Sequence, residues 1–416
     1  MSAVTSQARR PNLPRRLRMV NRVGGWLRRC GLPISDLSEE SVLRAAHRAT
    51  GLHDWGGDHY RVALRALLED FAGDERLTFL GRAMARSMLI QYVTNRLRIR
   101  ADLQRYPEIL RGVIRRPLFI VGLPRTGTTL LHHLLAQDSA ARPLLFWESV
   151  SPSPPPDIRT RDRDPRIKRA ERMLARMYRN VPRLSAIHRV DPRGPEECLL
   201  LLRNAFIADF QIRTPTFQRW LWELSAEDVR RAYEEYREQL LLLQWRCPGD
   251  HWVLKAPVHL FGLGALLATF PDACIVQTHR NPLECVPSMC SLVSVLDEIF
   301  YDRVDAEEIG RRTTAMLEEH LDRGMKARQS AGPGRFFDLP YQELVADPIA
   351  AVRKIYHYFG HEFRPALADK LAAYLAENPQ HKHGAHRYSL EDFGLDRDAL
   401  QARFAAYWDR FGGGEA

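Results

Sequence analysis

The chain has 416 residues, of which 45% are hydrophobic and 27% charged, and its formal net charge is +10 at pH 7. This composition is typical of a globular protein and excludes a fibrous or wholly disordered chain. No run of 18 or more apolar residues predicts a membrane span, and the first residues lack the pattern of a secretory signal. The six cysteines show neither a CxxC pair nor a zinc spacing, so we expect reduced thiols and a cytoplasmic location.

The positive charge is concentrated in residues 1–35, which contain eight arginines and no acidic residue. We interpret this segment as a basic N-terminal arm that serves as a tail or lid rather than as a binding element. Basic arms also contact nucleic acid or anionic membranes. We expect no nucleic acid partner, and peripheral contact of the arm with a membrane stays open as an alternative.

Residues 36–115 are predicted to form a helical region. Ser38 followed by two glutamates indicates the start of a helix, and Gly51 indicates its end. Apolar residues then recur at helical spacing from Tyr60 to Phe71, and again from Leu77 towards Ile99.

The pattern changes at Pro117, where the short apolar run Leu118–Val121 ends at Gly122 and predicts a buried parallel strand. Similar runs follow at Trp252–Leu254, Ala273–Thr278 and Phe336–Leu339, with helical patterns between them. We therefore predict an α/β fold for residues 116–416, with a central parallel sheet flanked by helices.

A long insert, residues 149–250, separates the first two of these strands. It contains a proline-rich start, an arginine-rich amphipathic stretch at Arg159–Arg179, and predicted helices at Pro195–Phe210 and Ala226–Trp245. Inserts of this kind commonly shape a substrate cavity. Near the C-terminus, the histidine-rich segment Glu377–Leu395 predicts a loop, followed by a last helix that ends at Phe411.

The sequence GLPRTGTT, Gly122–Thr129, follows the first predicted strand and precedes an apolar helix. Strand, glycine loop and helix in this order form a cradle for a phosphate, because loop N–H groups and the helix N-terminus together stabilise an anion. The candidate anion-binding residues are Arg125, Thr126, Gly127, Thr128 and Thr129.

Two features of a magnesium-dependent phosphate loop are missing. Thr128 stands where the Walker A lysine is expected, and the strand ACIVQT runs into His279 and Arg280 instead of ending in an aspartate. The sequence therefore indicates a nucleotide anion that lacks β- and γ-phosphates and binds without magnesium. Ser288 follows Arg280 by eight residues, and both are expected at the edge of the sheet where the strands end, as ligands of a second phosphate.

These motifs resemble those of sulfotransferases that use 3′-phosphoadenosine 5′-phosphosulfate (PAPS). GLPRTGTT resembles their 5′-phosphosulfate loop, and Arg280 with Ser288 resembles their 3′-phosphate site. The resemblance covers roughly Pro117–Phe359 and implies a sheet related to nucleotide kinases, PAPS as donor, no metal, and transfer of a sulfuryl group to an acceptor hydroxyl. The cytosolic members have lysine where Arg125 stands, and their C-terminal glycine-rich 3′-phosphate loop has no clear copy here. Lys382 and Arg387 are the candidates to replace that loop.

Sulfuryl transfer requires cations to stabilise the leaving phosphate and a base for the acceptor hydroxyl. Arg125 is a candidate cation from its place in the loop, and Lys255, at the end of the second predicted strand, resembles a lysine of the family. Three residues compete as the base, in the order Glu148, His259, Glu197. Glu148 resembles a glutamate of the tyrosylprotein and glycosaminoglycan enzymes, and His259 lies near the place of a histidine in the cytosolic enzymes. Glu197 is sufficiently explained as an acid in the first turn of a helix.

The acceptor is expected to be a small phenolic, steroidal or lipid-like alcohol. Aromatic residues of the insert are candidates to line its pocket, although side chains at helical spacing more often belong to the core: Phe206, Phe210, Phe217, Trp220, Trp222 and Trp245. Two alternatives stay open, a nucleotide kinase and a non-catalytic protein that binds nucleic acid or a membrane through the basic arm.

Overall fold

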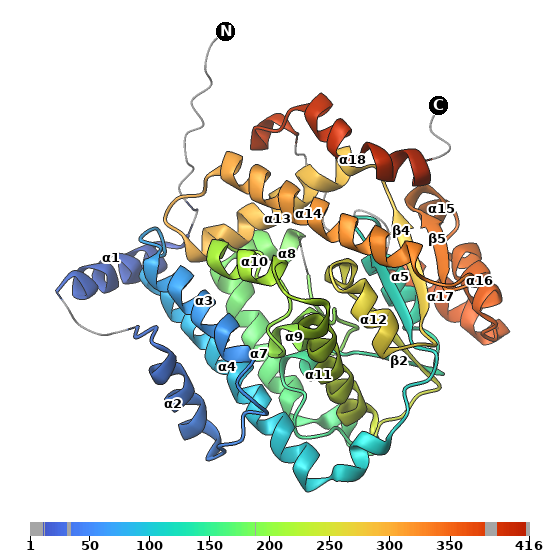
Figure 1. Cartoon of the computed structure of the whole chain (residues 1–416), viewed down its shortest axis with the longest axis horizontal. Coiled ribbons are helices and arrows are strands. Elements are labelled where there is room, and N and C mark those ends of the chain that lie inside the picture. The colour runs from blue at the N-terminus through green and yellow to red at the C-terminus, as the bar shows by residue number, and fades with distance from the viewer. Residues whose placement is uncertain (1–10, 12, 31–34, 188, 379–388, 413–416) are drawn as a thin grey trace.

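The computed structural model describes residues 11, 13–30, 35–187, 189–378 and 389–412. Its centre is a parallel five-stranded sheet in the order β2-β3-β1-β4-β5 (Figure 1). The strands are β1 (Leu118–Gly122), β2 (Ala141–Pro143), β3 (His251–Lys255), β4 (Cys274–His279) and β5 (Phe336–Pro340). The predicted α/β class with a central parallel sheet is confirmed. The sequence pattern missed β2, because three residues are too few to show a period.

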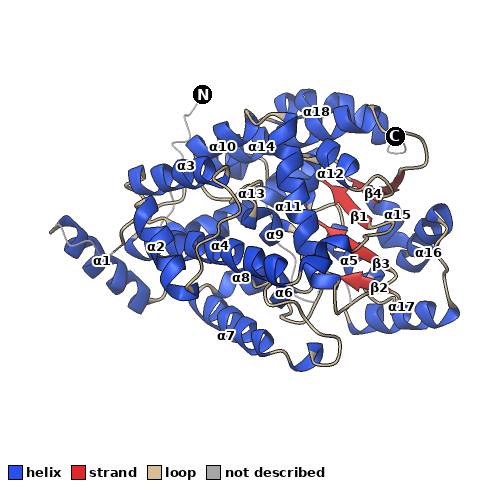
Figure 2. Cartoon of the chain, turned by 60° about the horizontal axis from the view of Figure 1, so that its bottom comes forward, coloured by secondary structure: helices blue, strands red, loops and turns tan. Residues whose placement is uncertain are grey.

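Both faces of β1 are covered, which explains why its residues are continuously apolar. Leu118 and Ile120 pack in one cluster with residues of α5 (Thr128–Leu135), α16 (Pro348–Phe359) and α17 (Pro365–Glu377). Phe119 and Val121 face a larger cluster formed by the other helices. Figure 2 shows the sheet between these two groups of helices.

Four helices precede the sheet: α1 (Arg15–Arg29), α2 (Glu39–Thr50), α3 (Tyr60–Gly73) and α4 (Phe79–Arg105). The hydroxyl of Ser38 accepts a hydrogen bond from the backbone N–H of Ser41 at 3.3 Å and caps α2, which ends at Gly51 with φ of 70°. Buried residues of α3 and α4 belong to the same hydrophobic cluster as Phe119. The N-terminal helices therefore share a core with the sheet, and the described part of the basic arm is largely helical.

Helix α6 (Phe146–Val150) leads into the insert, which contains α7 (Pro165–Asn180), α8 (Pro182–Ile187), α9 (Leu199–Asn204), α10 (Pro215–Trp222) and α11 (Ala226–Gln244). The predicted helix over Pro195–Phe210 is wrong at both ends, because only α9 is helical. Pro195 pairs with Leu145 in an isolated bridge, and Phe206 has φ of 57°, which a right-handed helix does not allow.

The remaining helices are α12 (Leu263–Thr269), α13 (Pro282–Phe300), α14 (Ala306–Gln329), α15 (Tyr341–Ala346) and α18 (Arg397–Phe411), with short 3₁₀ turns η1 (Pro107–Arg111), η2 (Arg161–Arg163), η3 (Pro257–Leu260) and η4 (Glu391–Phe393). The six cysteines form no disulfide. In the described part of the chain, none of the helices is both long and apolar enough to cross a membrane.

Candidate active site

The glycine loop lies between β1 and α5, and two of its glycines are required by their surroundings. Gly122 has φ of 139°, and a Cβ atom there would lie 2.5 Å from the hydroxyl oxygen of Thr278. Gly127 has φ of 83°, and its Cβ would lie 2.8 Å from a methyl carbon of Leu344. Both positions therefore exclude larger residues, and the chain can turn sharply from the strand into α5.

The buried hydroxyl of Thr126 stabilises the loop through hydrogen bonds. It donates to the carbonyl of Leu123 at 2.7 Å and lies 2.5 Å from the hydroxyl of Thr278 on the neighbouring β4. α5 begins at Thr128 immediately after the loop. The first N–H groups of a helix have no partner within the helix, so this end of α5 is suited to an anion.

Arg125, Arg280 and Ser288 lie together beside this loop, as expected from the sequence. The Nε of Arg125 donates to the hydroxyl of Ser288 at 3.1 Å, and Nη1 of Arg280 donates to the carbonyl of Arg125 at 3.0 Å. The guanidinium of Arg280 lies 4.3 Å from the ring centre of Tyr341 and pairs with Glu284. Two guanidinium groups thus face one region at the ends of β1 and β4. Lys382 and Arg387 lie outside the described residues.

A cavity of about 760 Å³ opens from the loop into the helical part of the molecule. Arg125, Thr128, Thr129 and Arg280 line it on the side of the sheet. Its other walls come mainly from apolar residues of α4, α7, α13 and α14, with six methionines among them: Met84, Met88, Met173, Met177, Met289 and Met316. The cavity therefore joins an anion site to an apolar chamber.

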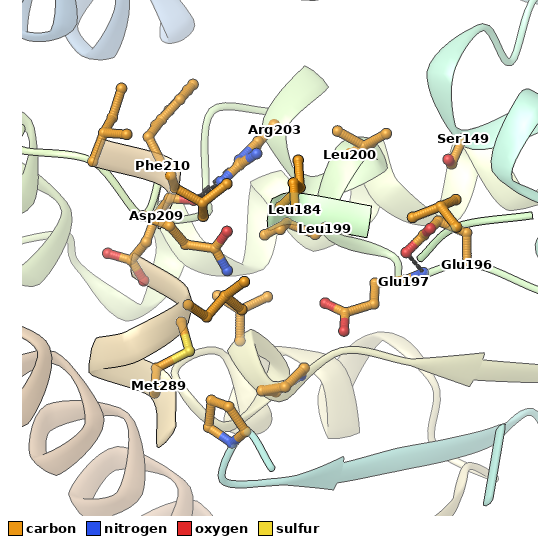
Figure 3. A pocket seen from close by; sticks show the side chains of 18 of the residues that line it. Ser149, Leu184, Glu196, Glu197, Leu199, Leu200, Arg203, Asp209, Phe210 and Met289 are labelled. Carbon is orange, nitrogen blue, oxygen red and sulfur yellow. Dashed lines mark hydrogen bonds between the residues drawn. The ribbon is translucent and has the colours of Figure 1, made fainter. Parts of the chain in front are cut away.

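Lys255 and Glu197 form an ion pair where these two parts meet. The Nζ of Lys255 lies 2.5 Å from Oε1 of Glu197 and 3.5 Å from the hydroxyl of Thr129. Lys255 is buried at the end of β3, whereas Glu197 lines the cavity and its side chain is 21% exposed. Figure 3 shows the Glu197 carboxylate in the open part of the cavity, with Glu196 folded back on the N–H of Glu197.

The segment that carries Glu197 is irregular, which corrects its assignment to the first turn of a helix. The N–H of Glu196 donates to the carbonyl of Leu144 at 2.8 Å, and that of Cys198 donates to the carbonyl of Lys255 at 2.9 Å. These two bonds hold the segment alongside β3 and bring Glu197 next to Lys255. The helix dipole therefore does not account for Glu197.

Glu148, the first-ranked base, lies elsewhere. Its side chain has no exposed surface, and its two oxygens accept bonds of 2.8 and 2.9 Å from the guanidinium of Arg142. The N–H of Leu145 donates a third bond, and Arg161 lies 3.4 Å away. Glu148 is absent from the described residues that line the cavity. A carboxylate held in this way has no contact with an acceptor hydroxyl, so the geometry does not support the ranking.

His259, the second-ranked base, is also enclosed. It has no exposed surface, its Nδ1 lies 2.9 Å from the hydroxyl of Tyr233, and its ring packs against Phe119 and Tyr236. Burial lowers the pKa of His259 to about 3, so the ring is neutral. Of the three candidates, Glu197 alone lines the cavity.

The family model described as "Sulfotransferase family" matches residues 117–365, more than half of the chain. The chain belongs to the sulfotransferase family. The resemblance that the loop and the Arg280 region indicated is thereby confirmed, and the sheet of this sulfotransferase has the P-loop-like fold.

Two solved structures are similar over nearly the whole chain. The sulfotransferase STF9 from Mycobacterium avium is 31% identical, with a TM-score of 0.83, and the match covers 91% of this chain and 97% of that one. The sulfotransferase STF1 from Mycobacterium tuberculosis is 32% identical, with a TM-score of 0.79, and the match covers 89% of this chain and 98% of that one. The omega-hydroxy-beta-dihydromenaquinone-9 sulfotransferase Stf3 from Mycobacterium bovis is 25% identical over 309 residues, which span 71% of this chain and 75% of that protein.

The lining of the apolar chamber was only partly foreseen. Of the aromatic residues considered for the pocket, Phe210 lines the cavity, and the others belong to the core or pack against it. The methionines were missed, although Met84 and Met88, and Met173 and Met177, stand four residues apart on α4 and on the amphipathic α7. At the far side from Glu197, the cavity is lined by Asp209 and His320, whose side chains lie 2.8 Å apart. In the described part of the chain, no cluster of three or more His, Cys, Asp or Glu side chains is arranged to hold a metal.

Proposed function

We propose that this sulfotransferase moves a sulfuryl group from PAPS to the hydroxyl of an apolar, lipid-like alcohol. One observation carries the proposal: a single cavity is lined by the glycine loop, by Arg125 and Arg280, by Glu197, whose ion-pair partner Lys255 is buried behind it, and by the walls of a methionine-rich chamber. An anionic donor and an apolar acceptor can therefore meet in one enclosed space.

The anion side of the cavity fits a donor with phosphates at two positions. The loop and the start of α5 would hold the 5′-phosphosulfate. Arg280 and Ser288 would hold the 3′-phosphate, since Arg280 is fixed by Tyr341, Glu284 and the Arg125 carbonyl beside the loop. No Walker lysine or Walker B aspartate is present to favour a nucleoside triphosphate with magnesium.

In the proposed reaction, the acceptor oxygen forms a bond to sulfur while the bond from sulfur to the 5′-phosphate oxygen breaks. The acceptor proton passes to the carboxylate of Glu197. Negative charge develops on the leaving phosphate, and Arg125 and the loop N–H groups would stabilise it, together with Lys255, whose Nζ lies 3.5 Å from the hydroxyl of Thr129 at the cavity wall. The buried Lys255 also positions Glu197 at the cavity wall, through the 2.5 Å ion pair.

The chamber favours an apolar acceptor. Methionine side chains are flexible and polarisable, so six of them form a wall that adapts to a long or irregular apolar molecule. A volume of about 760 Å³ is ample for a ligand of that kind. The relative Stf3 is named for a hydroxylated dihydromenaquinone, a lipid-like alcohol, and this agrees with the same class of acceptor here.

Calorimetry with nucleotides tests the donor. We expect 3′-phosphoadenosine 5′-phosphate to bind without magnesium and more tightly than AMP by roughly 10- to 150-fold, the value of one charge-assisted contact. Arg280→Ala should remove most of this difference and hardly alter AMP binding. Equal affinities for the two nucleotides, or a strict need for magnesium with ATP preferred, would contradict the proposed donor.

Substitution of two neighbouring glutamates tests the base. Glu197→Gln should retain the affinity for 3′-phosphoadenosine 5′-phosphate and lower turnover at least ~10²-fold, since the amide cannot take the proton. Glu196→Gln is the matched control, because Glu196 also lines the cavity but folds back on the backbone. Equal turnover in Glu197→Gln and the wild type would exclude Glu197 as the base.

A further inference from the structure

Helix α1 carries an apolar row that the protein does not cover. Met19, Val23 and Trp26 stand four and three residues apart, and they are 67%, 49% and 57% exposed. Arg18, Arg22 and Arg29, which stand four and seven residues apart, form an exposed row beside them on the helix. All six arginines of α1 are exposed, and α1 contains no acidic residue. This pattern is that of a helix that lies in the interface of an anionic bilayer.

The rest of α1 fixes it to two helices that line the cavity. Gly24 packs directly against the ring of Phe79, and Asn21 accepts a bond of 2.9 Å from the N–H of Leu80 at the start of α4. Arg16 donates a bond of 3.1 Å to Asn180 at the end of α7. The apolar row is thus presented outward from a helix that is held in place.

Helix α7 extends the same charged surface. Five of its basic side chains are exposed, against the single acid Glu171: Lys168, Arg169, Arg172, Arg176 and Arg179. By sequence, α1 carries a net charge of +6 and α7 of +5, and the net charge of the whole chain is +10. The positive charge of the protein is therefore concentrated on these two helices, which lie at its periphery in Figure 2.

The cavity has exposed lining residues on α4 and α7. Met84 on α4 and Met173 on α7 both line the cavity, and each is 41% exposed. Met84 stands four residues after Leu80 on α4, and Met173 stands seven residues before Asn180 on α7, and Leu80 and Asn180 are the residues that contact α1. The two exposed methionines of the cavity wall therefore stand on the same two helices that α1 contacts.

We propose that α1 and α7 dock on a bilayer containing anionic lipids, and that the acceptor enters the cavity from this bilayer past Met84 and Met173. The entry step rests on the proposed function, whereas the docking does not. The apolar row of α1 favours a bilayer over nucleic acid, because a phosphate backbone would engage the arginines and leave Met19, Val23 and Trp26 in water. This assignment replaces the interpretation of the arm as a mere tail or lid.

Co-sedimentation of the full chain with vesicles tests the docking. We expect binding to vesicles of equimolar phosphatidylcholine and phosphatidylglycerol that weakens with added salt, and little binding to phosphatidylcholine alone. The triple variant Arg18→Gln, Arg22→Gln, Arg29→Gln should lower the partition coefficient roughly 100-fold. Met19→Ser, Val23→Ser, Trp26→Ser should lower it by a comparable factor.

Val113→Ser and Lys370→Gln are the matched controls, since both residues are exposed on other elements, and they should bind vesicles as the wild type does. A chain lacking residues 1–35 should lose the binding while retaining affinity for 3′-phosphoadenosine 5′-phosphate. The docking would be overturned if all variants bound the vesicles equally or if the protein showed no preference for the anionic vesicles. It would also be overturned if the protein bound duplex DNA and the serine variants did not weaken that binding. Activity on a short-chain soluble alcohol without vesicles reports on the proposed function separately.

Discussion

Replacement of Glu148 by glutamine should lower the free energy of unfolding and leave the turnover of the folded protein unchanged. Glu148 is completely buried and Arg142 is 3% exposed, so their attraction is not screened by water. At an effective dielectric constant near 20, two charges about 4 Å apart attract by about 4 kcal/mol. Glutamine keeps the shape of the side chain, removes the charge, and turns an N–H₂ group towards the donors of Arg142 or Leu145. Breaking a buried pair in this way costs about 3 to 5 kcal/mol.

Urea unfolding followed by circular dichroism measures this loss, with turnover of the folded variant measured in parallel. The double variant Arg142→Met, Glu148→Leu removes both charges and should cost less than Glu148→Gln alone. Glu40→Gln is the control, because its pair with Arg44 is exposed and is worth less than about 1 kcal/mol. An unchanged urea midpoint for Glu148→Gln, combined with a loss of turnover of about 10²-fold, would refute the structural role and restore Glu148 as the base.

Two further predictions follow from other sites. Gly127→Ala should lower affinity for 3′-phosphoadenosine 5′-phosphate at least about tenfold by calorimetry, whereas Gly334→Ala, which has a similar φ of 75° but open space around it, should leave that affinity unchanged. Burial raises the pKa of Glu235, but the hydrogen bond from His59 and the charge of Arg96 outweigh it and bring the pKa down to about 2. This pKa lies below that of Glu235 in the unfolded chain. Ionised Glu235 should therefore contribute about 3 kcal/mol to the free energy of unfolding above pH ~4.5, and the contribution should fade as pH falls to about 2. The difference in urea midpoint between wild type and Glu235→Gln should shrink over that range, and a difference independent of pH would contradict the assignment.

Local patterns in the sequence were sufficient for four of the five strands and for the glycine loop. Strand β1 and Gly122–Thr129 are contiguous, so apolar runs and glycine spacing predict them directly. The pair Lys255–Glu197 joins residues far apart in the chain, and it depends on two backbone bonds of an irregular segment that has no period. The sequence ranked Glu148 first for a related reason: its partner Arg142 stands only six residues earlier, but spacing alone does not reveal that both side chains are buried.

The origin of the cavity walls has a consequence for how this enzyme can change during evolution. The proposed donor side comes from the ends of β1 and β4, whereas the proposed acceptor side comes mainly from α4, α7, α13 and α14. Replacing methionines on these helices reshapes the chamber without altering the backbone of Gly122–Thr129 or the contacts of Arg280. Acceptor preference can therefore diverge between descendants of one ancestral gene while the use of the donor is inherited unchanged.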